Sequence, residues 1–520
     1  MREGSARRRF LLGLGGLAAA IALPPAAPVT ASLPTGSGAG LAPGRNVPPL
    51  RDKQAAAGPR GAQAQTPTRR RAPRRPNFVV ILADDFGYGE IGVQGQKKIK
   101  TPRIDRMARE GLRFTDAYAP APVCAPARAS LLTGLHGGHA PVRRNPPKAG
   151  DLPLPKGIPT IATMLKRVGY RTGVFGKWGF GGPMPRNISH PDQLGFDEFY
   201  GYLTHFAAKH YYPDRLWDGR QAVPLPGNAG DKGPHYGPDL IMDRALDFAV
   251  RGGDDPFLLL LTLPLPHAHT APPPELGPYA EKDWRRADKV HAAKITRLDT
   301  YVGRLLDTLR ARGLDEDTIV ILTGDNGPHE EDGVNADFFN AGGPYRGVKR
   351  NLYEGGIRVP FIAWSPKIMA RTRGKKTDHP TVHYDLLATF ADFAGIRPVR
   401  GTDGLSLRKV LTGQKNPPRH EYLYWNRLHA GATPTHRKED GGRGRNAAAA
   451  VRFGRWKAVG FAPGQAYTQP DSTWTIELYD LAKDPGEKHD LAKKHPDLVR
   501  RARRHMRQAW RTPVSWKLIS

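Results

Sequence analysis

Short apolar runs alternate with amphipathic stretches over most of the chain, from residue 76 to about residue 413. The apolar runs have the length of strands buried on both faces of a parallel sheet, at residues 77–83, 171–175, 256–263, 318–322 and 359–364. Between them, residues 102–110, 160–168, 239–250, 288–312 and 385–394 have the pattern of helices. The alternation predicts an α/β fold with a mostly parallel or mixed central sheet and helices on both faces.

The pattern changes after about residue 413. Residues 421–425, 449–459 and 478–481 have the pattern of short strands in an antiparallel sheet, and residues 495–511 that of a basic helix. We therefore expect a main α/β domain at residues 76–415 and a smaller C-terminal subdomain at residues 416–520. The stretches 205–217, 272–279 and 429–442 are expected to be loops that shape a pocket.

Residues 1–31 have the pattern of an export signal. Arg7, Arg8 and Arg9 precede an apolar run that begins at Phe10, and small residues suited to cleavage stand at positions 29–31. Arginines directly before Phe-Leu resemble a twin-arginine signal, which exports folded proteins through the matching export machinery. A general secretory signal and a membrane anchor are the alternatives, but the apolar run is short and ends in two prolines, which argues against a stable membrane span. A periplasmic or extracellular location is expected.

Residues 32–75 are rich in Ala, Pro, Gly and Arg, and carry too little apolar surface to offset the entropy of ordering. They predict a disordered basic tether. A nucleic-acid-binding arm is disfavoured, because no aromatic residue is interleaved with the arginines for stacking on bases. The whole chain of 520 residues has a net charge of +30, which favours anionic partners without selecting sulfated, phosphorylated or polymeric ones.

Acidic and amide side chains follow two of the predicted strands. Asp84 and Asp85 end the strand 77–83, and Asp325 and Asn326 follow the strand 318–322. Sites in open α/β sheets form beyond the carboxyl ends of the strands, so we expect these side chains to meet. Three carboxylates close together are costly without a cation, and oxygen ligands favour Ca²⁺, or less well Mg²⁺, over Zn²⁺. Each pair by itself is also compatible with a helix cap or a turn.

The only cysteine, Cys124, lies in the stretch 123–134. Pro126 suits the first turn of a helix and Gly134 suits its end, so Cys124 is predicted at a helix N-terminus, where free N–H groups favour negative charge. Arg128 follows one helical turn later and can share the same face. The simple alternative is a small buried thiol. One cysteine excludes an intramolecular disulfide.

The pattern Cys-x-Pro-x-Arg, followed by Ala-Ser-Leu-Leu-Thr-Gly, resembles the signature of the sulfatase family, within the alkaline phosphatase superfamily. Blocks at residues 76–89, 324–329, 346–360 and 477–487 resemble further blocks of that family in the same order. The resemblance covers about residues 76–492. It implies an alkaline-phosphatase-like fold and an enzyme, a sulfuric ester hydrolase, that acts on aryl sulfates or sulfated glycans.

The resemblance also implies roles for the residues singled out above. Cys124 would be oxidised by a formylglycine-generating enzyme to formylglycine, whose hydrate is the nucleophile and completes the cation site. The oxygen ligands of that cation, usually Ca²⁺, would be Asp84, Asp85, Asp325 and Asn326. Arg128 would hold the nucleophile's hydroxyl and help to neutralise the sulfate. Lys177 and Lys349 would bind the sulfate oxygens, and His267 would assist the leaving alcohol.

Some alternatives stay open at this point. His269 or His329 could assist the leaving alcohol in place of His267, and the two lysines could be ordinary surface charges. Many family members have His two residues after the lysine of the Gly-Lys-Trp block, whereas this chain has Gly179. Either another histidine supports the nucleophile, or the chemistry relies more on Arg128 and the cation. The rival functions are a phosphate or phosphonate monoesterase and a non-catalytic anion-binding surface protein whose Cys124 stays unmodified.

Overall fold

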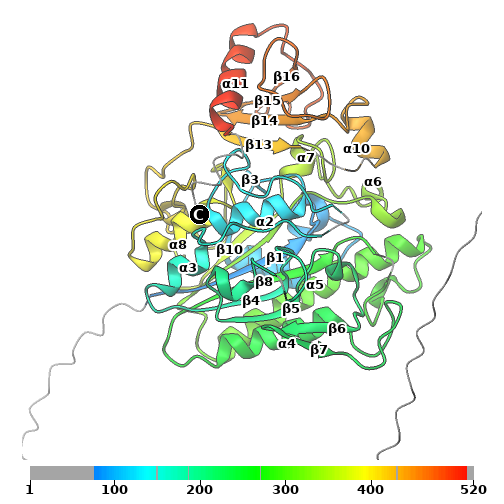
Figure 1. Ribbon diagram of the computed structural model, residues 1–520, viewed down its shortest axis with the longest axis vertical. Coiled ribbons are helices and arrows are strands. Elements are labelled where there is room, and N and C mark those ends of the chain that lie inside the picture. Colours follow the sequence, from blue (N-terminus) through cyan, green and yellow to red (C-terminus); the bar gives the residue numbers. More distant parts are fainter. Residues whose placement is uncertain are drawn as a thin grey trace, which may run out of the picture. The chain divides into compact units, whose positions relative to one another are not determined.

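The computed structural model describes residues 75–147, 150–185, 187–269, 271–428, 431 and 433–511 (Figure 1). The predicted export signal at residues 1–31 and the predicted tether up to residue 74 lie outside the described residues. Among the helices of the described part, none has both the length and the apolar character that a membrane span requires.

A mixed central sheet organises the fold. Its strands are β1 (Asn77–Asp84), β2 (Leu112–Phe114), β4 (Arg171–Lys177), β5 (Glu198–Tyr202), β6 (Arg215–Asp218), β7 (Gln221–Pro224), β8 (Phe257–Pro266), β9 (Thr318–Gly324), β10 (Phe361–Trp364) and β11 (Lys375–Thr377). Their order across the sheet is β11-β2-β10-β9-β1-β8-β4-β5-β6-β7. The stretch from β9 to β5 is parallel, while β10, β6 and β7 run antiparallel to their neighbours. The central position of β1 places its carboxyl end in the middle of the sheet edge.

Helices cover both faces of this sheet (Figure 1). Val79 and Ile81 of β1 belong to the core that includes helices α1 (Pro102–Glu110), α4 (Gly237–Val250) and α5 (Arg286–Ala311). Phe78 and Val80 belong to the opposite core, with α2 (Cys124–Thr133), α3 (Ile161–Lys166) and α8 (Asp385–Ala394). Neighbouring residues of one strand thus enter different cores, as the pleat requires. The predicted fold class is confirmed.

A separate antiparallel sheet follows near the C-terminus. Its strands, in spatial and sequence order, are β13 (Leu423–Arg427), β14 (Ala448–Phe453), β15 (Trp456–Phe461) and β16 (Thr475–Asp480). Helix α11 (Pro496–Ala509) packs against β14. The predicted single strand 449–459 is wrong, because the chain turns back at Gly454, whose φ of 59° suits a tight turn that an apolar pattern does not reveal. The boundary between residues 415 and 416 remains a prediction.

Several short elements complete the described part. All three predicted loops contain some regular structure, since 205–217 includes the 3-10 helix η4 (Ala207–Lys209) and the start of β6, 272–279 includes the 3-10 helix η5 (Gly277–Tyr279), and 429–442 includes α10. The short elements are the paired strands β3 (Ala117–Tyr118) and β12 (Thr381–Val382), and the helices α6 (Ala336–Phe339), α7 (Glu354–Ile357), α9 (Arg408–Leu411) and α10 (Pro434–Glu439).

A buried ionic network ties the antiparallel sheet to the first residue of α7. Lys457 of β15 lies 2.9 Å from Glu354 Oε1 and 2.9 Å from Glu487 Oε1. All three side chains are buried, so each charge depends on the others for compensation. Glu354 also accepts a hydrogen bond of 2.7 Å from Tyr118. The network fixes the beginning of α7, five residues after Lys349.

Candidate active site

The carboxyl ends of β1 and β9 bring the predicted acidic residues together. Asp84 is the last residue of β1, and Asp85 follows in a left-handed conformation with a φ of 64°. The Asp85 N–H donates to Asp325 Oδ1 over 3.0 Å. Adjacent strand residues point to opposite faces, so the left-handed turn at Asp85 is what allows both neighbouring carboxylates to face one cluster.

Each of the three carboxylates is paired with a buried cation. The pairs are Lys177 Nζ with Asp84 Oδ2 at 2.6 Å, Lys349 Nζ with Asp85 Oδ2 at 2.6 Å, and Arg128 Nε with Asp325 Oδ2 at 3.1 Å. Burial by itself would raise the pKa of Asp84, but Lys177, His267 and Arg128 hold it well below its ordinary value. The pKa of Asp325 is raised to about 7 by burial and by the negative charge of Asp84, despite Arg128. The cluster therefore has room for further positive charge.

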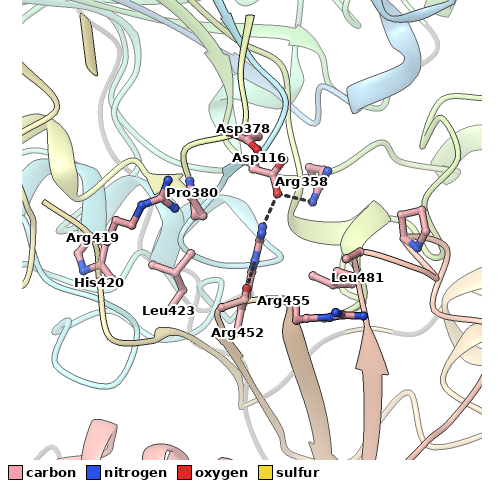
Figure 2. A pocket seen from close by; sticks show the side chains of 13 residues that line it. Asp116, Arg358, Asp378, Pro380, Arg419, His420, Leu423, Arg452, Arg455 and Leu481 are labelled. Atoms are coloured by element: carbon pink, nitrogen blue, oxygen red, sulfur yellow. Dashed lines mark hydrogen bonds and ion pairs between the residues drawn. The ribbon is translucent and has the colours of Figure 1, made fainter. Parts of the chain in front are cut away.

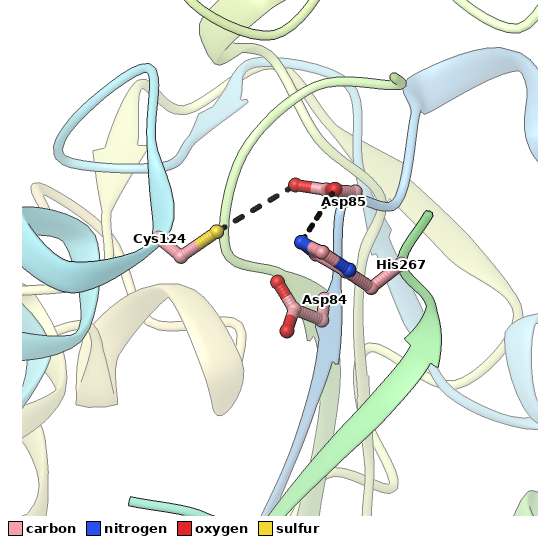
Figure 3. Close-up of side chains that lie close together, drawn as sticks. All are labelled: Asp84, Asp85, Cys124 and His267. Carbon is pink, nitrogen blue, oxygen red and sulfur yellow. Dashed lines mark hydrogen bonds and ion pairs between the residues drawn. The ribbon is translucent and has the colours of Figure 1, made fainter. Parts of the chain in front are cut away.

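Cys124 is the first residue of α2 and is completely buried. Its Sγ lies 3.7 Å from Asp85 Oδ1 and points into the cluster (Figure 3). Burial raises the pKa of this thiol well above its ordinary value, and Asp325 and Asp84 raise it further. The thiolate is the reactive form of cysteine, so the encoded side chain is a poor nucleophile in this setting.

His267 comes directly after β8 and completes the group in Figure 3. Its Nε2 lies 3.6 Å from Asp85 Oδ2, and its Nδ1 lies 2.8 Å from the carbonyl oxygen of Ala268. Nδ1 is therefore assigned the proton, and Nε2 faces the cluster. Burial lowers the pKa of His267 to about 4, although Asp85 and Asp84 oppose the shift, so the ring is neutral near pH 7.

The two other candidate histidines lie differently. His329 is buried, and its Nε2 lies 3.2 Å from the carbonyl oxygen of Pro266. His269 does not join the cluster, because its Nδ1 lies 2.7 Å from Asp231 Oδ2 in a neighbouring group. Of the three histidines considered from the sequence, His267 is the one whose ligand atom gathers with those of Asp84, Asp85 and Cys124, within 4.8 Å of one another.

The donor set fits a metal ion with oxygen ligands. Asp84 Oδ1 and Asn326 Oδ1 are buried and, within the described part of the chain, have no hydrogen-bond partner. The Asn326 amide is fixed by donating from Nδ2 to Asp85 Oδ1 over 2.8 Å, which leaves its Oδ1 free to bind a cation. Asp325 has less capacity left, since its two oxygens accept from the Asp85 N–H and from Arg128.

Two residues near the cluster were missed in the sequence. Glu331 Oε2 accepts a hydrogen bond of 3.0 Å from Lys349 Nζ, and no local pattern marks it. His205 is buried, and its Nδ1 has no hydrogen-bond partner among the described residues. Its Cα lies 3.6 Å from the position that a Cβ on Gly179 would take. The only sequence feature that could have pointed to His205 was Gly179, because a glycine at that position leaves space for the imidazole of a residue from another segment.

A cavity of about 410 Å³ lies away from this cluster (Figure 2). It is lined by several arginines, including Arg358 and Arg452, but both of these guanidinium groups pair with Asp116. Their charge is therefore largely compensated, whereas Cys124 and the predicted sulfate-binding lysines line the other site. The chemistry is expected at the Cys124 cluster.

Comparison with known proteins decides the family. The profile of the family described as Sulfatase matches residues 76–396, which include all the predicted site residues. The chain belongs to the sulfatase family. A second profile, described as N-sulphoglucosamine sulphohydrolase, C-terminal, matches residues 347–510.

Similar proteins agree with this assignment. Human arylsulfatase A (Homo sapiens) is 33% identical over 453 residues, covering 80% of this chain and 83% of the relative. The N-acetylgalactosamine-6-sulfatase of Canis lupus familiaris is 31% identical over 450 residues, covering 81% and 82%. A crystal structure of Ps i-CgsB in complex with k-i-k-neocarrahexaose superposes with a TM-score of 0.70 at 27% identity, covering 86% of this chain and 98% of that one. This sulfatase is thus a sulfuric ester hydrolase with an alkaline-phosphatase-like fold, and its family implies a metal ion and a formylglycine.

Proposed function

We propose that this sulfatase hydrolyses sulfate monoesters of glycans at the Cys124 cluster, with Ca²⁺ as its metal ion and formylglycine formed from Cys124. The main support is the convergence of three buried cations, Arg128, Lys177 and Lys349, on the carboxylates around Cys124. Burying three cations is costly, and the carboxylates offset that cost in this structure. An anionic substrate can use the same cations at their remaining donor positions.

When present, formylglycine would supply a hydrated aldehyde as the nucleophile, and Ca²⁺ would add positive charge for the nucleophile and the sulfate oxygens. The positively charged side chains of the protein would then stabilise the negative charge of the nucleophile and of the sulfate. Arg128 Nη2 is buried without a hydrogen-bond partner among the described residues, and it lies 3.8 Å from Asp84 Oδ2. This free N–H group is suited to a hydroxyl at position 124 or to a sulfate oxygen. Lys177, which contacts Asp84, and Lys349, which contacts Asp85, would hold further sulfate oxygens.

His267 would assist the leaving alcohol. Its Nδ1 is engaged with the carbonyl oxygen of Ala268, so Nε2 is the atom that exchanges a proton with the cluster side. The bound sulfate ester brings additional negative charge, which favours a proton at Nε2 that can pass to the departing oxygen. His205 would supply the second imidazole, next to Gly179, and orient the nucleophile's hydroxyl through its free Nδ1.

The substrate class rests on charge and on the relatives. A net charge of +30 favours polyanionic substrates such as sulfated polysaccharides. The similar proteins include an N-acetylgalactosamine-6-sulfatase and a protein crystallised with k-i-k-neocarrahexaose. Small aryl sulfates would serve as minimal substrates, since they present the same sulfate group to the same cations.

The first test combines mass spectrometry with turnover. A peptide with position 124 that is lighter than the thiol form by about the mass of one water molecule, together with sulfate release from sulfated glycans, supports the proposal. Equal or faster turnover of an aryl phosphate than of an aryl sulfate would instead favour a phosphate or phosphonate monoesterase. Binding of sulfated glycans without sulfate release, with an intact thiol in the native host, would show an anion-binding protein.

Export is part of the proposal. The arginines and apolar run of residues 1–31 support delivery to the periplasm or the medium, with a formylglycine-generating enzyme and the export machinery as transient partners. Sulfated polysaccharides are met outside the cell, so location and substrate agree. Fractionation of the native host with an antibody against the mature chain tests the location.

A further inference from the structure

A second group of potential metal ligands lies beside the catalytic cluster. His210, Asp231 and His269 each offer one ligand atom, and these three atoms lie within 4.8 Å of one another. They come from three separate segments, before β6, between β7 and α4, and after β8. The rings of His210 and His269 are 5.5 Å apart at an interplanar angle of 62°, so they do not stack.

The contact between His269 and Asp231 is incomplete as a hydrogen bond. His269 Nδ1 lies 2.7 Å from Asp231 Oδ2, yet both atoms are buried without a hydrogen-bond partner of acceptable geometry in the described part of the chain. Asp231 is held from the other side, because its Oδ1 accepts a hydrogen bond of 2.7 Å from the N–H of Tyr212. Its Oδ2 is thereby directed at the imidazole nitrogen and is otherwise uncommitted.

A third histidine–carboxylate group in the chain shows the contrast. His139 Nδ1 lies 2.9 Å and 3.0 Å from the two oxygens of Asp403, with hydrogen-bond geometry, and Asp403 also accepts from the N–H of His136. Both oxygens of Asp403 are satisfied in this way without an ion, and His139 Nε2 is the buried atom of this group that lacks a hydrogen-bond partner among the described residues. The group around Asp231 leaves two buried atoms unsatisfied and has an exposed histidine beside them.

The site is accessible to solvent and to ions. His210, Asp231 and His269 line a cavity of about 710 Å³, together with Tyr212 and Trp217. His269 also lines a smaller cavity of about 150 Å³ that contains His267. Its ring therefore stands between an open pocket and the catalytic side of the protein.

We propose that His210, Asp231 and His269 bind a divalent transition-metal ion, with Zn²⁺ as the probe. Two imidazole nitrogens and one carboxylate are ligands that suit Zn²⁺ and its neighbours in the first transition row, while Ca²⁺ prefers oxygen ligands alone. Water from the cavity completes the coordination. The chain would thus carry two cation sites of different chemistry, one of oxygen ligands at Asp84 and one of mixed ligands at Asp231.

The bound ion would stabilise the segment that carries His267. Lys294 Nζ donates to the carbonyl oxygens of His269 over 2.6 Å and of His267 over 3.3 Å, and the Tyr211 hydroxyl donates to the latter over 2.8 Å. A metal ion on the His269 ring adds a fixed point two residues from His267. It also links this segment to the one that carries His210.

The test is a Zn²⁺ titration of the full chain with Ca²⁺ in excess, read by equilibrium dialysis and metal analysis. We expect one tightly bound equivalent, and binding at least about tenfold weaker in His210→Ala and in Asp231→Asn. His210 is exposed, so its replacement is not expected to disturb folding, and circular dichroism verifies this. The matched control is His139→Ala, which should bind like the parent.

A variant of the catalytic cluster, Cys124→Ala, distinguishes Zn²⁺ binding at this site from Zn²⁺ binding at the catalytic cluster. In Cys124→Ala the equivalent of Zn²⁺ should remain, and the additional change His210→Ala should remove it. Zn²⁺ binding that is lost in Cys124→Ala alone, or that is unchanged by His210→Ala, would overturn the proposal. These readouts do not depend on sulfate release, so a failure of the proposed function leaves them interpretable.

Discussion

Lys349 and Asp85, which lie 264 positions apart in the sequence, form a buried ion pair of 2.6 Å. Lys349 is also held by Glu331 Oε2 at 3.0 Å. Replacing Lys349 with alanine should lower kcat/KM for an aryl sulfate by about 10²–10³-fold, because a positive charge that we propose binds the sulfate is lost. The exposed residue Lys488 offers the control variant Lys488→Ala, which should keep full activity. A loss smaller than about threefold in Lys349→Ala would remove Lys349 from the sulfate site.

The imidazole of His205 should matter for turnover more than for stability. His205→Ala is expected to lower kcat by roughly 10–100-fold with little change in KM, since its proposed role is to orient the nucleophile's hydroxyl rather than to bind the distal part of the substrate. His205→Gln should recover part of the loss, because an amide can still form one hydrogen bond there. The control is the exposed His489. Parent-like kcat in His205→Ala would mean that Arg128 and the metal ion suffice.

Removal of the metal ion should abolish activity reversibly. Exhaustive dialysis against a calcium chelator is expected to reduce sulfate release to background. Ca²⁺ should restore it better than Mg²⁺, because Ca²⁺ accepts varied arrangements of oxygen ligands, whereas Mg²⁺ demands a near-ideal octahedron of short bonds. Asn326→Ala should raise the Ca²⁺ concentration needed for half-restoration, as it removes the free Oδ1. The prediction would be contradicted if the protein kept full activity in a sample that metal analysis shows to be free of bound ion.

Asp299 should give the protein a pH-dependent stability. Burial, together with Asp105, raises the pKa of Asp299 from 3.8 to about 7, although the N–H of Ile104 donates to it over 2.7 Å. The folded state therefore binds more protons than the unfolded state between about pH 4 and pH 7, and the free energy of unfolding falls as pH rises through this window. At pH 8 the buried Asp299 carboxylate lowers the free energy of unfolding by up to roughly 4 kcal/mol.

Asp299→Asn should remove this slope while keeping the acceptor oxygen. We expect its thermal midpoint to exceed that of the parent at pH 8 and to approach it at pH 4. Asp307→Asn, on the exposed side of the same helix, is the control and should follow the parent at both values. An Asp299→Asn profile parallel to that of the parent would show that the carboxyl group titrates near its ordinary pKa when folded.

Local patterns were sufficient for the elements whose burial is uniform. The apolar run of β1 predicted a strand buried on both faces, and α1 and α8 were predicted with the bounds that the structure shows. The meeting of Asp84, Asp85, Asp325 and Asn326 followed from the rule that parallel strands end at one edge. Their positions follow from the order and direction of the strands, which the alternation of predicted strands and helices along the sequence indicates.

The remaining features depend on contacts between distant segments. The hairpin at Gly454 lies within a run that alternates like one strand, so only pairing with β13 and β16 reveals two strands. Glu331 reaches Lys349 from a loop, and the place of His205 beside Gly179 depends on how two loops pack. No periodicity encodes such contacts. The roles of the individual site residues stay predictions until the variants are measured.

The complete burial of Cys124 would set an order of events in making the proposed formylglycine form. A converting enzyme must take the side chain into its own active site, and a thiol in the first turn of α2, closed in by Asp85 and its cations, cannot be presented in that way once the chain has folded. The proposed oxidation of Cys124 would therefore have to precede folding, and the two processes would compete for each new chain. A host that folds this protein faster than it oxidises it would accumulate a well-folded but permanently inactive product, which no later treatment with the converting enzyme could rescue without unfolding.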